Sequence, residues 1–285
     1  MGTLFLVATP IGNLDDITHR AIRILSQVKL IAAEDTRRTR KLLTHYHIST
    51  PLISYHEHNK LSRLDEVVSA LSQGDVALVS DAGTPGLNDP GYELVKATVQ
   101  SGFPISPIPG PCAPIAALTA SGLPTDAFLY LGYLPRKSNE RCLHLRQLRD
   151  LSFTMIFLEA PHRLLAALQD LHSELGDRYM VVARELTKLH EEIFRGKVSE
   201  AWSYFSTRQI RGEITLVIAG NTTPERWQEG QLLSALRQRL ANGTSPAQIA
   251  SELSRQSGWA RRTVYRLITE IQNSVSSGES SEQNN

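Results

Sequence analysis

Ser80-Asp-Ala-Gly-Thr-Pro-Gly-Leu-Asn-Asp-Pro-Gly91 is the stretch that decides the fold. It follows the apolar run Val76–Val79, which is too short for a helix and rich in β-branched residues, so we predict a buried strand ending at Ser80. Asp81 then lies at the carboxyl end of that strand, and the glycines after it let the backbone approach a ligand closely. Ligands of open α/β sheets bind at the carboxyl ends of strands. The stretch therefore predicts the floor of a binding cleft, with a long tight turn as the alternative.

Strands and helices are predicted to alternate on both sides of this stretch. The other strands expected in this part are residues 3–8, 29–33, 51–54 and 105–108. Each is followed by a helical pattern: Asp15 or Asp16 is expected to cap the first helix, and Thr36 to open a basic second one. Such alternation predicts an α/β fold with a parallel sheet that helices cover on both faces.

The pattern changes after residue 122. Strands are predicted at 128–133, 153–158, 179–184, 191–194 and 213–219, and helices at 139–150, 161–175 and 198–205. The connections after residue 179 are short, so we expect a mixed sheet in a second domain. Residues 221–224 have the composition of a linker. We therefore predict an N-terminal domain at 1–122, a second domain at 123–222 that completes the cleft, and a helical tail at 223–285.

The tail is basic and is predicted to form three short helices, at 231–240, 245–253 and 260–268. Residues 231–270 contain six arginines and two glutamates. The last helix carries Arg261, Arg262 and Arg266, and a tightly joined helix pair of this kind is similar to a helix-turn-helix. The tail is thus a candidate RNA-binding element, and an ordinary small helical bundle is the alternative. From residue 273 onward the polar composition predicts disorder.

Composition limits the classes of partner and compartment. The 285 residues include 30 basic and 29 acidic side chains, so binding of a polyanion would have to depend on local patches. Cys112 and Cys142 form neither a disulfide framework nor a metal-binding spacing, which is typical of a reducing compartment. The N-terminal residues do not have the pattern of a signal peptide, and no apolar run is long enough for a bilayer span. We expect a soluble, cytoplasmic protein.

Several kinds of site are disfavoured. The first strand is followed by neither a Gly-x-Gly-x-x-Gly pattern nor a Walker loop. Two His-x-His pairs, at 45 and 47 and at 56 and 58, flank a predicted strand, and we predict no metal site there. Glu34, Asp35, Asp81 and Glu159 follow strands, so they are expected near one edge of the cleft. Neighbours in an extended chain point in opposite directions, so one of Glu34 and Asp35 is expected to cap the helix of Arg37.

Seven motifs together give a resemblance to a known family. They are Ala8-Thr-Pro-Ile-Gly-Asn13, Glu34-Asp-Thr-Arg37, Ser54-Tyr-His-Glu-His-Asn59, the stretch 80–91, Pro109-Gly-Pro111, Glu159-Ala-Pro-His-Arg163 and Arg184-Glu-Leu-Thr-Lys188. The chain resembles the tetrapyrrole-methylase superfamily over about residues 3–220. It is most similar to the branch that methylates a ribose 2'-oxygen of a cytidine in the decoding region of 16S rRNA.

The resemblance implies that S-adenosylmethionine is the cofactor and binds in a cleft between the two domains of the chain. It also implies a homodimer, and 16S rRNA of the small ribosomal subunit as partner. The residues that it places around the cofactor are Pro10, Asp81, Gly83, Thr84, Pro85, Cys112, Ala113, Leu186, Ile214 and Thr215. Two positions depart from the related enzymes. Ala8 and Pro10 replace the first two glycines of the Gly-x-Gly-Pro-Gly-Asp pattern of tetrapyrrole enzymes, and Cys112 stands where the RNA-modifying branch more often has serine.

The chemistry of a ribose acceptor suggests further residues. A hydroxyl is a weak acid, so its methylation needs a group that removes its proton or stabilises negative charge on the oxygen. The candidates are Glu159, Lys188, Glu34 and His56. Arg37, Arg38 and Arg40 are candidate phosphate contacts, with a solvated helix face as the alternative. A small-molecule methyltransferase acting on a tetrapyrrole and a non-enzymatic nucleic-acid-binding protein remain the other possible functions.

Overall fold

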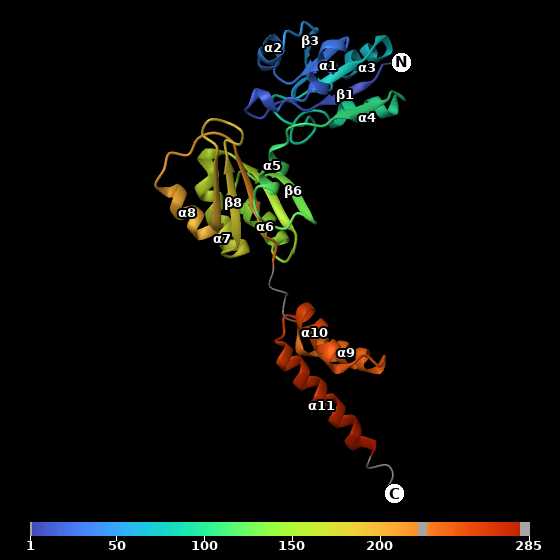
Figure 1. Cartoon of the computed structure of the whole chain (residues 1–285), viewed down its shortest axis with the longest axis vertical. Helices are drawn as coiled ribbons and strands as arrows, with labels where there is room; N and C mark the ends of the chain where they lie inside the picture. Colours follow the sequence, from blue (N-terminus) through green and yellow to red (C-terminus); the bar gives the residue numbers. More distant parts are fainter. Residues whose placement is uncertain (1, 222–226, 280–285) are drawn as a thin grey trace. The chain divides into compact units, whose positions relative to one another are not determined.

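The computed structural model describes residues 2–221 and 227–279, with the backbone alone at residue 255 and residues 273–279. The chain forms two compact units, one of residues 1–149 and 153–220 and the other of residues 150–152 and 221–285. Figure 1 colours them along the sequence. Most of the predicted linker, residues 222–224, lies outside the described residues, and the predicted three-domain division stays a prediction. In the described residues no helix combines the length and the apolar character that a membrane crossing requires.

A parallel five-stranded sheet forms the first part of the larger unit, with strand order β3-β2-β4-β1-β5. The strands are β1 (Leu4–Val7), β2 (Leu30–Ala33), β3 (Leu52–Ser54), β4 (Val76–Val79) and β5 (Ile105–Ile108). Strand β4 lies between β2 and β1, where all four of its residues are buried. The carboxyl ends of β2, β4 and β1 are therefore neighbours at one edge of the sheet.

Helices cover both faces of this sheet, which confirms the predicted α/β architecture. On one face, the side chains of α1 and α2 pack with Ile31 and Val79, and on the other, those of α3 and α4 pack with Ala32 and Leu78. The helices are α1 (His19–Gln27), α2 (Thr36–His45), α3 (Leu64–Gln73) and α4 (Tyr92–Gln100). Alternate residues of each strand thus point into two separate apolar layers.

The predicted cap of the first helix is wrong. Helix α1 is capped by Thr18, whose hydroxyl accepts a hydrogen bond from the backbone N–H of Ala21 at 3.0 Å. Asp15 and Asp16 lie earlier, in the short 3-10 helix η1 (Leu14–Asp16), which Asn13 caps. The residue before the first helical turn is the one whose side chain reaches the free N–H groups, and here that residue is Thr18.

The second sheet is mixed, as predicted, with order β6-β7-β10-β8-β9. Strands β6 and β7 pair in parallel and the other neighbours are antiparallel. Its strands are β6 (Phe128–Tyr133), β7 (Thr154–Glu159), β8 (Tyr179–Arg184), β9 (Glu192–Lys197) and β10 (Ile214–Ile218). Strand β9 extends three residues beyond the predicted end because it pairs with the whole of β8.

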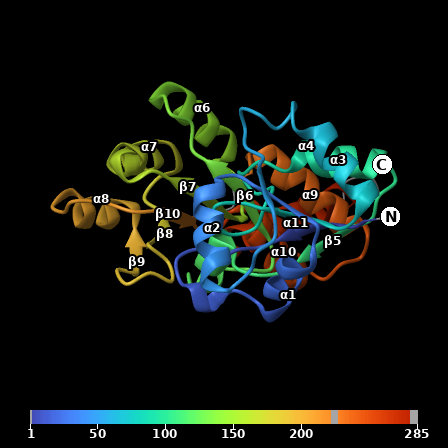
Figure 2. The same ribbon diagram turned by 90° about the horizontal axis from the view of Figure 1, so that it is seen from above.

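Two groups of helices pack against the second sheet. Helix α5 (Ala113–Thr119) packs on β7 and β10, where Ala117 and Leu118 meet Ile156 and Val217. Helices α6 (Ser138–Leu148), α7 (Leu164–Leu175) and α8 (Val198–Ser206) contact one another in a row, and the short 3-10 helix η2 (Pro161–Arg163) precedes α7. Figure 2 shows this row from above.

The smaller unit is a three-helix structure with its own core. It contains α9 (Glu229–Ala241), α10 (Pro246–Ser257) and α11 (Arg261–Glu279), around the buried side chains of Leu232, Leu253 and Ile268. The chain turns between α10 and α11 at Gly258, which has a left-handed conformation. Helix α11 continues to Glu279, so the predicted disorder from residue 273 is wrong for 273–279. Residues 280–285 lie outside the described residues.

Candidate functional site

The loop after β4 is pinned to the loop after β1. Thr9 and Gly83 exchange two backbone hydrogen bonds, each of 2.9 Å. Gly83 has φ +82°, a left-handed conformation that a residue without Cβ adopts at little cost. The hydroxyl of Thr84 donates a hydrogen bond to the backbone oxygen of Pro111 at 3.2 Å, which ties the same loop to the start of α5. The glycine-rich stretch is thus a fixed wall.

This wall belongs to a cavity of about 390 Å³ that is lined by residues of both sheets. Its volume lies within the range usual for sites of small organic ligands, roughly 300–1,000 Å³. Eight of the ten predicted cofactor residues line it: Asp81, Gly83, Thr84, Cys112, Ala113, Leu186, Ile214 and Thr215. Pro85 is buried within the loop and does not line the cavity. Pro10 lines a smaller neighbouring cavity.

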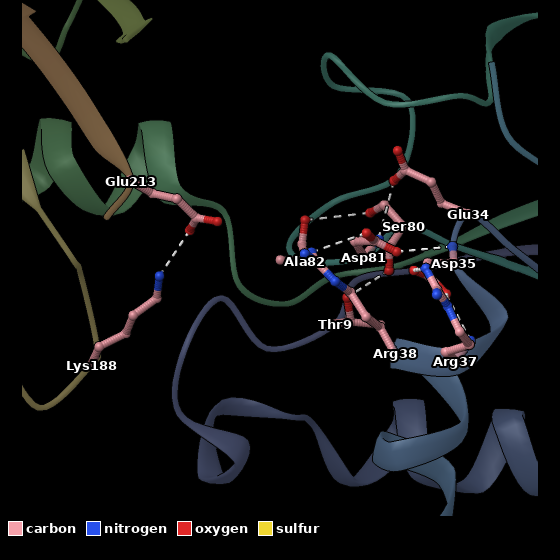
Figure 3. A network of polar contacts seen from close by, with 10 residues as sticks. All are labelled: Thr9, Glu34, Asp35, Arg37, Arg38, Ser80, Asp81, Ala82, Lys188 and Glu213. Atoms are coloured by element: carbon pink, nitrogen blue, oxygen red, sulfur yellow. Dashed lines mark hydrogen bonds and ion pairs between the residues drawn. The ribbon is translucent and has the colours of Figure 1, made fainter. Parts of the chain in front are cut away.

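Asp81 is the centre of a polar network at the carboxyl ends of β2 and β4 (Figure 3). Its Oδ1 accepts a hydrogen bond from the backbone N–H of Asp35 at 2.9 Å, and its own N–H donates to Glu34 Oε2 at 3.3 Å. Its Oδ2 lies 3.1 Å from Nη1 of Arg38. The network therefore joins two strand ends to the first turn of α2.

One member of the acidic pair caps α2, as predicted, and the structure identifies it as Asp35. Its carboxylate caps α2 by accepting a hydrogen bond from the backbone N–H of Arg37 at 2.8 Å. The Arg37 guanidinium also binds both carboxylate oxygens, at 3.1 and 2.8 Å. These hydrogen bonds hold the pKa of Asp35 below its ordinary value. The other member, Glu34, lines the cavity, where burial raises its pKa.

Glu159 lines the cavity, but its carboxylate is engaged. Its side chain is fully buried, and its two oxygens lie 2.9 and 3.0 Å from Nε and Nη2 of Arg163. The backbone N–H of Ala160 donates a further hydrogen bond to it at 2.7 Å. The Arg163 side chain is itself only 16% exposed. The pair fixes the end of β7 to the start of α7.

The other two predicted catalytic residues are outside the cavity lining. Lys188 pairs with Glu185 at 2.7 Å and with Glu213 at 3.1 Å, and Glu213 does line the cavity. His56 lies after the edge strand β3, and its Nδ1 is buried without a hydrogen-bond partner among the described residues. Lys188 thus reaches the site through Glu213, whereas His56 does not contribute to the cavity wall.

Three groups of the cavity wall were not predicted from sequence: Asp89, Glu213 and the tyrosines Tyr130 and Tyr133. Asp89 belongs to the glycine-rich stretch, and its position in a loop after a buried strand was a usable signal. The Tyr130 hydroxyl donates to Asn88 Oδ1 at 2.6 Å, and burial raises the pKa of Tyr130 to about 12. No local pattern distinguishes these tyrosines from ordinary strand residues, so only the tertiary structure reveals them.

Asp89 predicts a pH-dependent stability. Burial, together with the nearby negative charge of Glu34, raises its pKa from 3.8 to about 6. A carboxyl with a raised pKa stabilises the fold most below the unfolded value of 3.8, and this stabilisation is lost as the pH rises through about 6. Near pH 8 the free energy of unfolding of Asp89→Asn should therefore be about 1 kcal/mol higher than that of the wild type. This difference should vanish in acid.

Urea unfolding at a series of pH values measures this effect. The matched control is Asp126→Asn, because Asp126 is exposed in the loop before β6. A constant difference between Asp89→Asn and wild type across the pH range would show that ionisation of Asp89 is not responsible.

No group of three or more His, Cys, Asp or Glu side chains within residues 2–221 and 227–279 is placed to hold a metal ion. The cavity is lined by the fixed wall of the glycine-rich stretch, by two tyrosines and by carboxylates. Five acidic residues line the cavity: Glu34, Asp81, Asp89, Glu159 and Glu213. Such a wall suits a ligand with positive charge and an apolar or aromatic part.

Comparison with known proteins places the chain among methyltransferases. Residues 3–201 match the family model of tetrapyrrole (corrin/porphyrin) methylases. A Synechocystis protein named ribosomal RNA small subunit methyltransferase I is 49% identical over 95% of this chain and 99% of its own length. A protein of the same name from Halalkalibacterium halodurans is 43% identical, over 93% of this chain and 94% of its own.

Solved structures show the same fold at low identity. The methyltransferase CobJ superposes with a TM-score of 0.60 at 18% identity and covers 80% of this chain and 98% of its own. Uroporphyrin-III C-methyl transferase from Thermus thermophilus, in complex with S-adenyl homocysteine, gives a TM-score of 0.55 at 18% identity, with coverage of 76% and 97%. The two-sheet arrangement is therefore one that other methyltransferases share.

Proposed function

Because this chain belongs to the tetrapyrrole methylase family, and within it to the ribosomal RNA small subunit methyltransferase I proteins, we propose that it methylates 16S rRNA with S-adenosylmethionine. The finer proposal is transfer to the ribose 2'-oxygen of a cytidine in the decoding region. The observation that carries the proposal of an rRNA substrate is the near-full-length identity to the rRNA methyltransferases, which includes the helical tail. The finer proposal rests on the resemblance of the seven motifs. The setting that we propose is a cytoplasmic homodimer acting on the small ribosomal subunit.

The cavity fits the cofactor chemically. S-adenosylmethionine combines a planar adenine with a positively charged sulfonium, and the wall combines apolar groups such as Ile11 and Leu186 with carboxylates and tyrosine rings. At Gly83 an added Cβ would lie 3.4 Å from Ile11 Cγ2, which is ordinary van der Waals contact, so a larger side chain would extend from there into the cavity. We propose that the residues that hold the cofactor are the eight lining residues, with Pro10 and Pro85 shaping the loops behind them.

The cofactor supplies a methyl group on a good leaving group, so the protein has to position a hydroxyl and manage its proton. Glu34 and Asp89 line the cavity, and burial raises the pKa of both carboxyls, which makes them stronger bases than exposed carboxylates. We propose that one of them accepts the proton. Both Glu159 oxygens bind Arg163, and we propose that Glu159 stabilises the fold at the end of β7 and is not the base. Lys188 does not line the cavity, and we propose that it fixes the lining residue Glu213 through their ion pair.

Exposed arginines provide the RNA contacts in this proposal. Arg37, Arg38 and Arg40 lie on α2, whose first turn borders the cavity. In the smaller unit, Arg261, Arg262 and Arg266 are exposed on α11. The ion pair of Arg266 with Glu270 is long, with 3.6 Å between Nε and Oε1. The catalytic role of His56 stays a prediction, since His56 lines neither of the two cavities.

Replacing Arg261, Arg262 and Arg266 with methionine should weaken binding of small ribosomal subunits and leave the affinity for S-adenosylmethionine unchanged. Removal of each arginine that binds a phosphate should reduce the slope of log affinity against log salt by about 0.7 to 0.9. Filter binding at several salt concentrations measures this slope. The α9 residue Arg239, which pairs with Glu252, serves as the control site through Arg239→Met. An unchanged slope in the triple variant would assign these arginines to the solvated surface.

The proposed function is tested by mapping methylated riboses in rRNA from cells without this protein. One decoding-region cytidine should lose its 2'-O-methyl group and regain it when the wild-type chain is restored. Retention of that methyl group, with loss of a methyl group elsewhere, would replace the proposed acceptor. Calorimetry in which the folded protein binds no S-adenosylmethionine would contradict the proposal as a whole.

A further inference from the structure

A second cavity, of about 200 Å³, shares Arg38 and Asp81 with the cofactor cavity. The loop after β1 lines it with Thr9 and Pro10, and α2 lines it with Arg38 and Lys41. Arg38 and Lys41 are three residues apart on one helix, so their side chains lie on the same face. A space of this size beside two cationic side chains suits one phosphate group rather than a whole nucleotide.

Arg38 and Asp81, which form an ion pair (Figure 3), line both cavities. The two side chains of this ion pair differ in how firmly they are held. Asp81 is held by the N–H of Asp35 on its other oxygen, and its side chain is 23% exposed, whereas the Arg38 side chain is 65% exposed. An ion pair this exposed contributes little to stability. A second anion can therefore replace Asp81 as the partner of the Arg38 guanidinium at a small cost in free energy. Arginine also binds phosphate with strong charge-assisted hydrogen bonds.

We propose that the second cavity binds a phosphate of the RNA chain next to the acceptor nucleotide, and that Arg38 leaves Asp81 to pair with this phosphate. The inference rests on the proposed function, since it takes RNA and S-adenosylmethionine as the two ligands. Once Arg38 has moved, the Asp81 carboxylate stands uncompensated in the wall of the cofactor cavity. That wall then attracts a positively charged ligand more strongly than a neutral one.

The consequence is a coupling between RNA and the charge of the cofactor. S-adenosylmethionine carries a sulfonium charge that its demethylated product lacks. Bound RNA should therefore favour the charged cofactor over the spent one, and by linkage the charged cofactor should favour RNA to the same extent. Arg38 is a positioning residue in this account, because it acts on the cofactor through Asp81.

Equilibrium dialysis with two unreactive ligands tests the coupling. Sinefungin carries an ammonium group in place of the sulfonium methyl, and S-adenosylhomocysteine carries no charge there, so neither is consumed. Their affinities are measured with and without saturating small ribosomal subunits from cells that lack this protein. Subunits should increase the preference of the wild type for sinefungin by roughly three- to tenfold.

Two variants of α2 decide the role of Arg38. Arg38→Met should show the same preference with and without subunits. Arg40→Met, on the same helix but outside both cavity linings, should keep the full shift while binding subunits more weakly. Lys41→Met should weaken subunit binding by roughly three- to tenfold.

A wild type without any shift, or a shift that survives in Arg38→Met, would overturn the inference and leave the proposed function standing. Failure of the wild type to bind either ligand or the subunits would overturn both. Addition of inorganic phosphate alone distinguishes a chain phosphate from a free anion. A full shift with free phosphate at millimolar concentration would overturn the assignment to RNA.

Discussion

Gly83→Val is expected to weaken binding of S-adenosylmethionine at least tenfold, which corresponds to about 1.4 kcal/mol. Gly83 lines the cavity, so the added methyl groups take space from the cofactor. An added Cβ would already lie 3.4 Å from Ile11 Cγ2 and 3.7 Å from the Pro111 oxygen. A β-branched residue is also strained at φ +82°, so a loss of stability is expected as well. Calorimetric titration of the folded variant measures the affinity.

Gly86→Val is the matched control. Gly86 has φ +85°, so valine is equally strained there, but no heavy atom lies within 4 Å of an added Cβ and Gly86 does not line the cavity. This variant should lose similar stability and keep its cofactor affinity. Equal losses of affinity in both variants would mean that loop strain, and not the space at Gly83, controls binding.

Glu159→Gln is expected to lower the free energy of unfolding by about 3 kcal/mol, because it leaves the Arg163 guanidinium without its buried counter-charge. Turnover, measured at a temperature where the variant is folded, should fall by less than about threefold. A general base would behave in the opposite way, since loss of such a group reduces turnover by roughly 10²–10⁴-fold and stability little. Urea unfolding and methyl transfer to small subunits measure the two quantities.

The partner residue provides the control for this prediction. Adding Arg163→Met to Glu159→Gln should destabilise less than the sum of the two single changes, because the pair is coupled directly. Glu213→Gln should lose little stability, because the Glu213 side chain is 72% exposed. A stable Glu159→Gln variant with greatly reduced turnover would restore Glu159 as the base.

Local pattern was sufficient for the fold and for one loop of the cavity wall, and the family resemblance supplied most of the other lining residues. Short β-branched runs followed by amphipathic segments predicted both sheets, since strand and helix periods are properties of a few neighbouring residues. The stretch 80–91 predicted a binding loop, and eight of the ten residues carried over from the resemblance line the cavity. Helix ends were less accurate: Thr18 and not Asp15 or Asp16 caps α1, because neighbouring polar residues compete for the same N–H groups.

The sequence by itself determined the alternation of elements and the loop with Asp81 at a strand end, because these depend on residue spacing along the chain. Only the tertiary structure decided which groups meet Asp81. The order β3-β2-β4-β1-β5 puts β4 between β2 and β1, which brings Glu34 and Thr9 to the same edge from distant positions. The Glu159–Arg163 ion pair is local, because the two residues are four apart in the sequence, whereas the second sheet brings Tyr130 and Glu213 to the wall from distant positions. Such meetings depend on strand order and packing, which residue spacing does not encode.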